Sequence, residues 1–248
     1  MSYPAPVFRQ RRHQHGVSLV ELMVAMTIGL ILLAAMAYLF IGTRQTSRTQ
    51  DDLSRLQETG RIALDVVGQM VRHAKYVDYP NTNWDLAHPA AADAWLVATD
   101  NGTDPDSLTV RFEPISGAVG DTDCTGANRK NLAVPHSNLV QASLSINGSN
   151  ELVCGNGTTT AVLFDDIENM QITYGVDTTG DSAADSYVDA PANINQVVAI
   201  RVGLLVRSRD GASPVKQTYT YNGSEVTADD YRLRQEFVTT YTLRNLVP

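Results

Sequence analysis

An uninterrupted apolar segment near the start of the chain limits what the protein can fold into. From Leu22 to Thr43, 22 residues carry no formal charge and include no proline. As an α-helix this run would be about 33 Å long, enough to cross a hydrocarbon layer of roughly 30 Å. The residues before it carry Arg9, Arg11 and Arg12 and no acid. The positive-inside rule therefore predicts a cytoplasmic N-terminus, with the rest of the chain beyond the membrane.

Three ordinary interpretations of the segment are open. A buried core helix is disfavoured, because a run of this length that is apolar on every side exceeds what a soluble core needs. A plain membrane anchor fits the length. A secretory signal peptide also fits, since Ala35-Met36-Ala37 offers small residues at a cleavage position, after which the mature chain would begin at Tyr38.

Glu21 is the residue that these interpretations leave unexplained. A charged side chain at the centre of a membrane costs on the order of 2.5–3.5 kcal/mol, so an acid at the start of a span is a functional-site hypothesis by default. The alternative is that Glu21 extends its carboxylate to the membrane surface and has no further role.

The sequence around this acid carries a resemblance. Gly16-Val17-Ser18-Leu19-Val20-Glu21-Leu22-Met23 resembles the processing site of type IV pilins and the related pseudopilins. In that family a membrane peptidase cuts after the glycine and methylates the new N-terminal residue. The resemblance implies cleavage between Gly16 and Val17, N-methylation of Val17, and an assembly role for Glu21. It also implies four segments: a leader (1–16), a transmembrane assembly helix (17–43), an amphipathic half of that helix (44–79) and a β-rich head domain (80–248).

The spacing of Val17 and Glu21 supports an assembly role independently. Residues four apart lie on one face of a helix, about 6 Å apart along its axis. In a stack of parallel helices shifted along that axis, Glu21 of one subunit can meet the positively charged amine of a neighbour's Val17. Since an unpaired carboxylate is costly in a low dielectric and a paired one is tolerable, the pair favours one assembly register.

Beyond Thr43 the pattern changes to that of an amphipathic helix. Apolar residues recur at spacings of three and four, with charges between them: Leu53, Leu56, Ala63, Leu64, Val67, Met70 and Val71. We expect this stripe to pack on a domain core rather than to form a partner groove. The helix is predicted to end between Lys75 and Tyr79, before Pro80.

The remainder of the chain has the pattern of β structure. Candidate strands rich in Val, Ile, Thr and Tyr are Leu108–Phe112, Leu139–Ile146, Ala161–Phe164, Met170–Tyr174, Val197–Val206, Gln217–Tyr221 and Phe237–Leu243. Asn-Gly pairs at 101–102, 147–148, 156–157 and 222–223 predict turns, several of them in hairpins. Asn81–Asp106 is predicted to be a long irregular connection. These patterns predict an α+β fold: a long N-terminal helix packed on an antiparallel sheet.

The resemblance extends into this C-terminal half. Residues 164–177, 198–207, 232–237 and 243–245 are similar to the PilW group of minor pilins. That likeness implies a structural subunit of the complex that primes a pilus and lies near its tip. Its implied partners are other minor pilins, the major pilin, prepilin peptidase, the inner-membrane assembly machinery and a tip adhesin. The implied location is first the bacterial inner membrane, with a cytoplasmic N-terminus and a periplasmic head, and then the pilus.

Cys124 and Cys154 are the only cysteines. If the head lies in an oxidising periplasm, a disulfide between them is expected. Two reduced thiols are the alternative, and a metal pair is disfavoured because no histidine is nearby.

Asp177, Thr179, Asp181 and Asp185 place oxygen-bearing side chains at alternating positions, loosely like a calcium loop. Ser182 replaces the usual glycine, and Val188 stands where a bidentate glutamate would be expected. An acidic, solvated turn is therefore the competing interpretation, and no other cofactor is predicted.

Several classes of function are disfavoured. The net charge of −8 argues against binding nucleic acid through phosphate neutralisation. The sequence has no Gly-x-Ser-x-Gly, His-Glu-x-x-His, phosphate-binding glycine loop or Cys-x-x-Cys, so no enzyme is predicted. The alternatives to a minor pilin are a minor pseudopilin of a type II secretion system and a secreted binding domain with an ordinary signal peptide.

Overall fold

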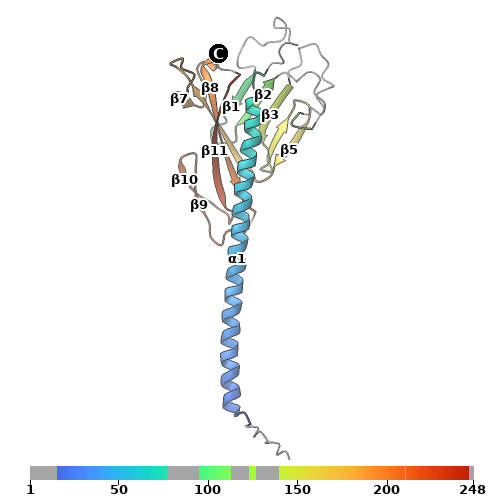
Figure 1. Ribbon diagram of the computed structural model, residues 1–248, viewed down its shortest axis with the longest axis vertical. Helices are drawn as coiled ribbons and strands as arrows, with labels where there is room; N and C mark the ends of the chain where they lie inside the picture. Colours follow the sequence, from blue (N-terminus) through green and yellow to red (C-terminus); the bar gives the residue numbers. More distant parts are fainter. Residues whose placement is uncertain (1–15, 77–94, 113–122, 127–139, 210, 246–248) are drawn as a thin grey trace, which may run out of the picture. The chain divides into compact units, whose positions relative to one another are not determined.

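The computed structural model describes residues 16–76, 95–112, 123–126, 140–209 and 211–245. The chain folds as two units, Met1–Arg48 and Thr49–Pro248. The long helix α1 (Leu19–Arg72) contributes to both (Figure 1). Residues 1–15, which hold most of the predicted leader, and residues 77–94 lie outside the described residues.

In the second unit, the described residues form strands that alternate with short turns. They are β1 (Leu96–Thr99), β2 (Ser107–Phe112), β3 (Val140–Ile146), β4 (Leu152–Gly155), β5 (Thr160–Phe164), β6 (Ile167–Val176), β7 (Ser186–Val188), β8 (Val197–Arg207), β9 (Thr218–Tyr221), β10 (Ser224–Thr227) and β11 (Arg234–Thr242). A short 3₁₀ helix, η3 (Ile194–Gln196), precedes β8.

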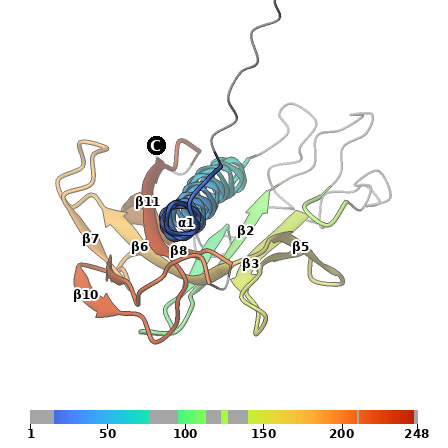
Figure 2. The ribbon, with the colours of Figure 1, turned by 90° about the horizontal axis from the view of Figure 1, so that it is seen from below.

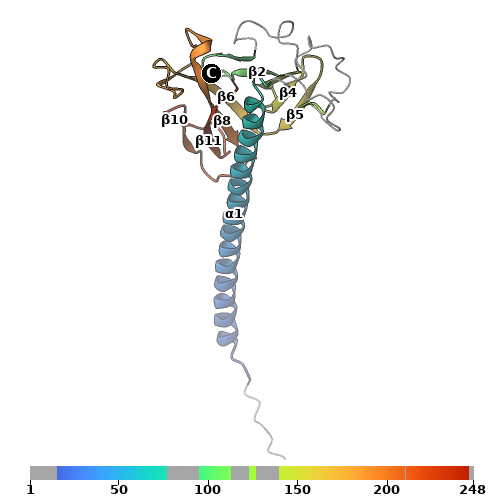
Figure 3. The same ribbon diagram turned by 45° about the horizontal axis from the view of Figure 1, so that its top comes forward.

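These strands make three antiparallel sheets. The first has the order β1-β2-β3-β4-β5, the second β11-β8-β6-β7, and the third is the hairpin β9–β10. Seen from below, the β11-β8-β6 strands and the β2-β3-β5 strands lie on opposite sides of the C-terminal part of α1 (Figure 2), and Figure 3 shows the same order from another side. The predicted α+β fold, with a long helix and antiparallel sheets, is confirmed.

The core of this unit follows from the alternation of side chains along the strands. In β2 every second residue is buried, namely Leu108, Val110 and Phe112. They pair in register with the inward residues of β3, as Leu108 opposite Leu144 shows. The helix contributes a matching stripe, of which Leu56, Ala63, Leu64, Val67 and Val71 are buried. The predicted core-facing stripe is therefore confirmed, except that Leu53 is 37% exposed and Met70 is partly buried.

Two glycines let the helix approach β11 closely. A Cβ atom at Gly60 would overlap the ring of Phe237, and one at Gly68 would overlap the ring of Tyr241. The two glycines are eight helical residues apart, or about 12 Å, and the two aromatic residues are four strand residues apart, or about 13 Å. Because these lengths nearly match, both glycine–ring contacts can form at the same time. The Tyr241 hydroxyl donates a hydrogen bond to the Leu64 carbonyl, which fixes the register of strand against helix.

The helix ends earlier than the sequence predicted. The predicted end lay between Lys75 and Tyr79, but α1 ends at Arg72. The backbone then tightens, as His73 and Ala74 donate to carbonyls only three residues back, and Lys75 takes a left-handed conformation with φ of 57°. A left-handed residue at this position stops a helix.

The prediction that Asn81–Asp106 is irregular throughout was wrong, because it contains β1. Leu96 and its neighbours pair with Val110 and the rest of β2. Because β1 has only four residues, its alternation of apolar and polar residues is too short to predict a strand, and its strand conformation depends on the pairing with β2. All seven predicted strands occur with shifted ends, while β4, β7 and β10 were missed for the same reason of short length. Leu139, the predicted start of β3, lies outside the described residues.

Candidate assembly site

The predicted processing site lies where the helix begins. Gly16, Val17 and Ser18 precede α1, and the Leu22 amide donates to the Ser18 carbonyl at 3.0 Å as the first turn closes. Glu21 lies in that first turn, where the partial positive charge of the helix N-terminus favours an acid. Within the described residues, no basic group pairs with its exposed carboxylate.

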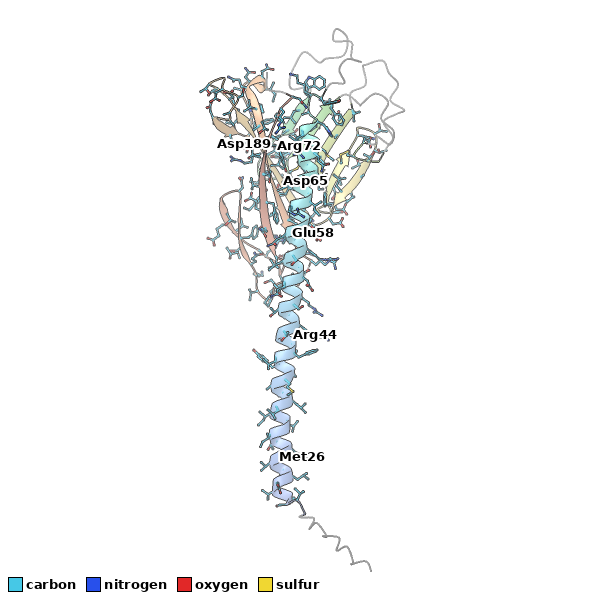
Figure 4. The ribbon with its side chains drawn as sticks, viewed as in Figure 1. Met26, Arg44, Glu58, Asp65, Arg72 and Asp189 are labelled. Carbon is cyan, nitrogen blue, oxygen red and sulfur yellow. A yellow bond between two sulfur atoms is a disulfide. The ribbon has the colours of Figure 1, made fainter. Side chains whose placement is uncertain are left out.

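The helix that follows is apolar on every side and buries none of its large side chains. From Val17 to Ile41 all large apolar residues are at least 50% exposed. Figure 4 shows side chains, Met26 among them, projecting all round this part of the helix. By length and composition it is the one helix among the described residues that can cross a membrane. Such a surface needs an apolar cover, either lipid or other helices.

Three threonine hydroxyls of this segment are satisfied within the helix. The hydroxyls of Thr27, Thr43 and Thr46 each donate to a backbone carbonyl three or four residues back, at 2.8–3.0 Å. Arg44, the first charge after the uncharged run, places its guanidinium 4.3 Å from the ring centre of Phe40. These threonine hydroxyls can therefore enter lipid or a helix bundle without becoming unpaired donors.

In the second unit, a network of ion pairs joins three elements that the sequence did not predict to be linked. The Arg234 guanidinium donates to Glu168 at 2.6 and 2.8 Å and to Asp230 at 2.6 and 2.9 Å. Arg207 extends the network to Asp166 at 3.1 Å. These bonds clamp β6, β8 and the start of β11 together. Hydrogen bonds from Arg234 lower the pKa of Asp230 to about 2.

A buried carboxylate joins the two larger sheets. Asp106, only 2% exposed, accepts bonds from the amides of Asn101 and Ile172 at 2.9 and 2.8 Å. Burial raises its pKa despite these bonds. Alternation along β2 gave no signal for this residue, because it lies just outside the strand. Its role is to satisfy backbone donors between sheets, which is structural.

Cys124 and Cys154 form a disulfide, with their Cα atoms 6.0 Å apart. It ties the short segment 123–126 to strand β4. Asn156 adds polar contacts to the same segment, donating to Asp123 at 2.6 Å and to Thr125 at 3.1 Å.

The four oxygen-bearing residues suggested as a calcium loop lie in the turn before β7. Asp177 accepts bonds from the amides of Thr179, Gly180 and Ser182, and Asp185 accepts from Thr178 and Thr179. These bonds lower the pKa of both carboxylates. Each thus accepts several N–H bonds as the turn stands, and calcium binding stays a prediction. No group of three or more acidic, histidine or cysteine side chains suited to a metal occurs in the described ranges.

Parts of this chain match known protein families. Residues 127–245 match the family described as type IV pilus-assembly protein W, and residues 11–37 match the prokaryotic N-terminal methylation motif. Among curated proteins, no significant match was found. A solved type IV-like pilin from Thermus thermophilus is similar with a TM-score of 0.49 and 17% identity, over 78% of this chain and 98% of that one.

The helix, the sheets and the two family matches define a type IV pilin-like protein. Within that class the chain is most like the PilW group of minor pilins, and the resemblance predicted from the sequence is confirmed. The family is one of structural pilus components, and the methylation motif with the apolar helix fits membrane anchoring in the pilus system.

Proposed function

We propose that the chain is a minor pilin of the complex that primes a type IV pilus and lies near its tip. The observation that carries the proposal is the exposed apolar surface of α1, most of which lies within the match to the N-terminal methylation motif at residues 11–37. A monomer in water does not leave such a surface uncovered. The match to a pilus-assembly family favours this function over a type II secretion pseudopilin or a secreted binding domain.

In this proposal, prepilin peptidase cuts between Gly16 and Val17 on the cytoplasmic side and methylates Val17. Before cutting, the apolar helix holds the chain in the inner membrane, and the positively charged leader keeps the N-terminus in the cytoplasm and the head in the periplasm. Cutting removes the leader and creates an amine at Val17. In the fibre, that amine pairs with the Glu21 carboxylate of a neighbouring subunit, which replaces the hydration both groups lose.

The partners in the proposal are other minor pilins and the major pilin, reached through the apolar helix, and the inner-membrane assembly machinery. A tip adhesin is a further proposed partner.

Calcium at Asp177, Thr179, Asp181 and Asp185 is a separate proposal, tested by calorimetry with calcium on the full chain. Heat release together with a raised melting temperature supports it, and the absence of both removes it.

Loss of the gene tests the cellular role. If the protein primes pilus assembly, its deletion abolishes surface pili and twitching motility, and the intact gene restores both. Normal pili with loss of secreted enzymes instead would assign the protein to a type II secretion system.

A further inference from the structure

The four Asn-Gly pairs close four hairpins, but their side chains are held to different degrees. They lie between β1 and β2, β3 and β4, β4 and β5, and β9 and β10. Asn-Gly is the dipeptide most open to deamidation, because glycine leaves the following amide nitrogen sterically accessible. Whether a given pair reacts in a folded protein depends on how freely the asparagine side chain and that nitrogen can approach each other.

Three of the pairs are held by hydrogen bonds. Asn101 donates its side-chain amide to the Pro105 carbonyl at 2.8 Å, and the Gly102 nitrogen is engaged by Asp100 at 2.7 Å. In the β3–β4 turn, Asn147 donates to Glu151 at 2.7 Å and accepts from the amides of Ser149 and Glu151.

Asn156 is held most tightly. Its side-chain nitrogen donates to Asp123 and Thr125, and its side-chain oxygen accepts from the amides of Thr158 and Thr159 at 3.0 and 2.8 Å. To reach its glycine neighbour, this side chain must first break several bonds, some of them to the disulfide-linked segment.

Asn222 differs from these three. Its backbone amide donates to Glu236 at 3.2 and 3.3 Å, but within the described residues its side chain makes no hydrogen bond. It is exposed, and Gly223 has open space where a side chain would be. Both residues have positive φ, 48° and 73°, as a two-residue hairpin turn requires.

We propose that Asn222-Gly223 is a site of spontaneous chemical modification, namely deamidation of Asn222. The Gly223 nitrogen attacks Cγ of Asn222, forming an N–C bond. The Cγ–Nδ2 bond breaks, and ammonia leaves with the proton from the Gly223 amide. Water then opens the resulting cyclic imide at either carbonyl, giving aspartate or isoaspartate at position 222. One water is consumed and one ammonia released for each event.

The product changes the hairpin in two ways. A new carboxylate lies beside Glu236, whose own carboxylate accepts the backbone amide of residue 222. Like charges at this distance repel and weaken that contact. Isoaspartate also adds an atom to the backbone of a turn that has only two residues. The β9–β10 hairpin, which carries Tyr219 within 5.8 Å of the Arg234 guanidinium, therefore loosens from the sheet as the protein ages.

The test compares the four pairs within one molecule. The full chain in detergent micelles is incubated in mildly alkaline buffer, and deamidation at each asparagine is followed over time by mass spectrometry of its peptides. We expect Asn222 to react at least about tenfold faster than Asn147 and Asn156, because those side chains must first lose hydrogen bonds. The Asn222→Gln variant removes the fast reaction, whereas Asn147→Gln retains it.

Unfolding provides the matched control. In concentrated urea with reductant, all four pairs lose their contacts. Asn222 should then deamidate no faster than the other three asparagines. If Asn222 is no faster than the others in the folded chain, or if the order of rates is the same folded and unfolded, the proposal is wrong.

Discussion

The two halves of helix α1 are covalently continuous and chemically different. Up to Arg48 its large apolar side chains are all exposed, and the hydroxyls of Thr27, Thr43 and Thr46 bond to their own helix. From Thr49 onward, one stripe is buried among strands while the opposite face carries charges. The comparison teaches that one helix serves two environments. Its second half stabilises a folded domain, and its first half is proposed to be covered by lipid or by neighbouring helices. Changes in the first half should therefore alter assembly, and changes in the second should alter unfolding.

The largest expected effect is on assembly. Glu21→Gln keeps the shape of the side chain but removes the charge that the proposed amine needs, leaving that amine unpaired. An unpaired charge in low dielectric costs on the order of 3–5 kcal/mol, so incorporation into pili should fall at least about tenfold. The amount of the variant in sheared fibres, relative to cells, measures this.

Glu58→Gln is the matched control, because Glu58 is an exposed acid in the second half of the same helix. It should be incorporated normally, and neither variant should change the unfolding temperature. Equal incorporation of both variants would remove the proposed pairing.

The disulfide should have the largest effect on unfolding. Replacing Cys124 and Cys154 together by serine frees a loop with a sequence separation of 30. In the chain-entropy model this costs about 3–4 kcal/mol, moderated here by the polar contacts of Asn156 with the same segment. Chemical unfolding of the full chain in micelles measures the loss. Reduction of the natural protein should give a similar decrease, and an unchanged midpoint in both cases would contradict the prediction.

Glycine substitutions compare the two halves directly. At Gly68 an alanine Cβ would overlap the Tyr241 ring, so Gly68→Ala should lower the free energy of unfolding by about 2–3 kcal/mol. At Gly42 nothing lies within 4 Å, so Gly42→Ala should change it by less than about 0.5 kcal/mol. Thermal unfolding of both variants in the same detergent measures the two effects. Equal effects would mean that the helix does not pack on β11 as described.

The smallest expected effect is a pH dependence in the ion-pair network. Arg234 lowers the pKa of Asp230 from 3.8 to about 2, so this group adds stability above pH 4 that is lost as the pH falls through about 2. Arg234→Met should be less stable at neutral pH and should show a smaller further loss over that acidic interval. Unfolding curves at several pH values measure the difference. A parallel loss in both proteins would show that the network does not set the pKa of Asp230.

Much of the fold was predictable because its patterns are local. The uncharged run and the spacing of Leu56, Ala63 and Val67 report a helix and its buried side without tertiary information. Most strands of four or fewer residues were missed because they carry too little alternation, and β1 is defined by its pairing with β2. The end of the helix was misplaced because the left-handed Lys75 has no distinctive residue type.

The residues of the candidate sites divide in the same way. Gly16, Val17 and Glu21 could be proposed from the sequence because their motif is contiguous. Arg234, Glu168 and Asp230 could not, because Glu168 lies 66 positions from Arg234 and only the pairing of β6 and β11 with β8 brings them together. No regular spacing along the sequence links these three residues, so the sequence alone could not predict their contact.

The mass of the mature N-terminus tests the central claim most directly. The claim is that removal of the leader turns the first half of α1 into an assembly surface. Mass spectrometry of the protein recovered from pili should find a chain that begins with N-methylated Val17. Recovery only of a chain that still begins at Met1, or of one that begins at Tyr38, would contradict the account.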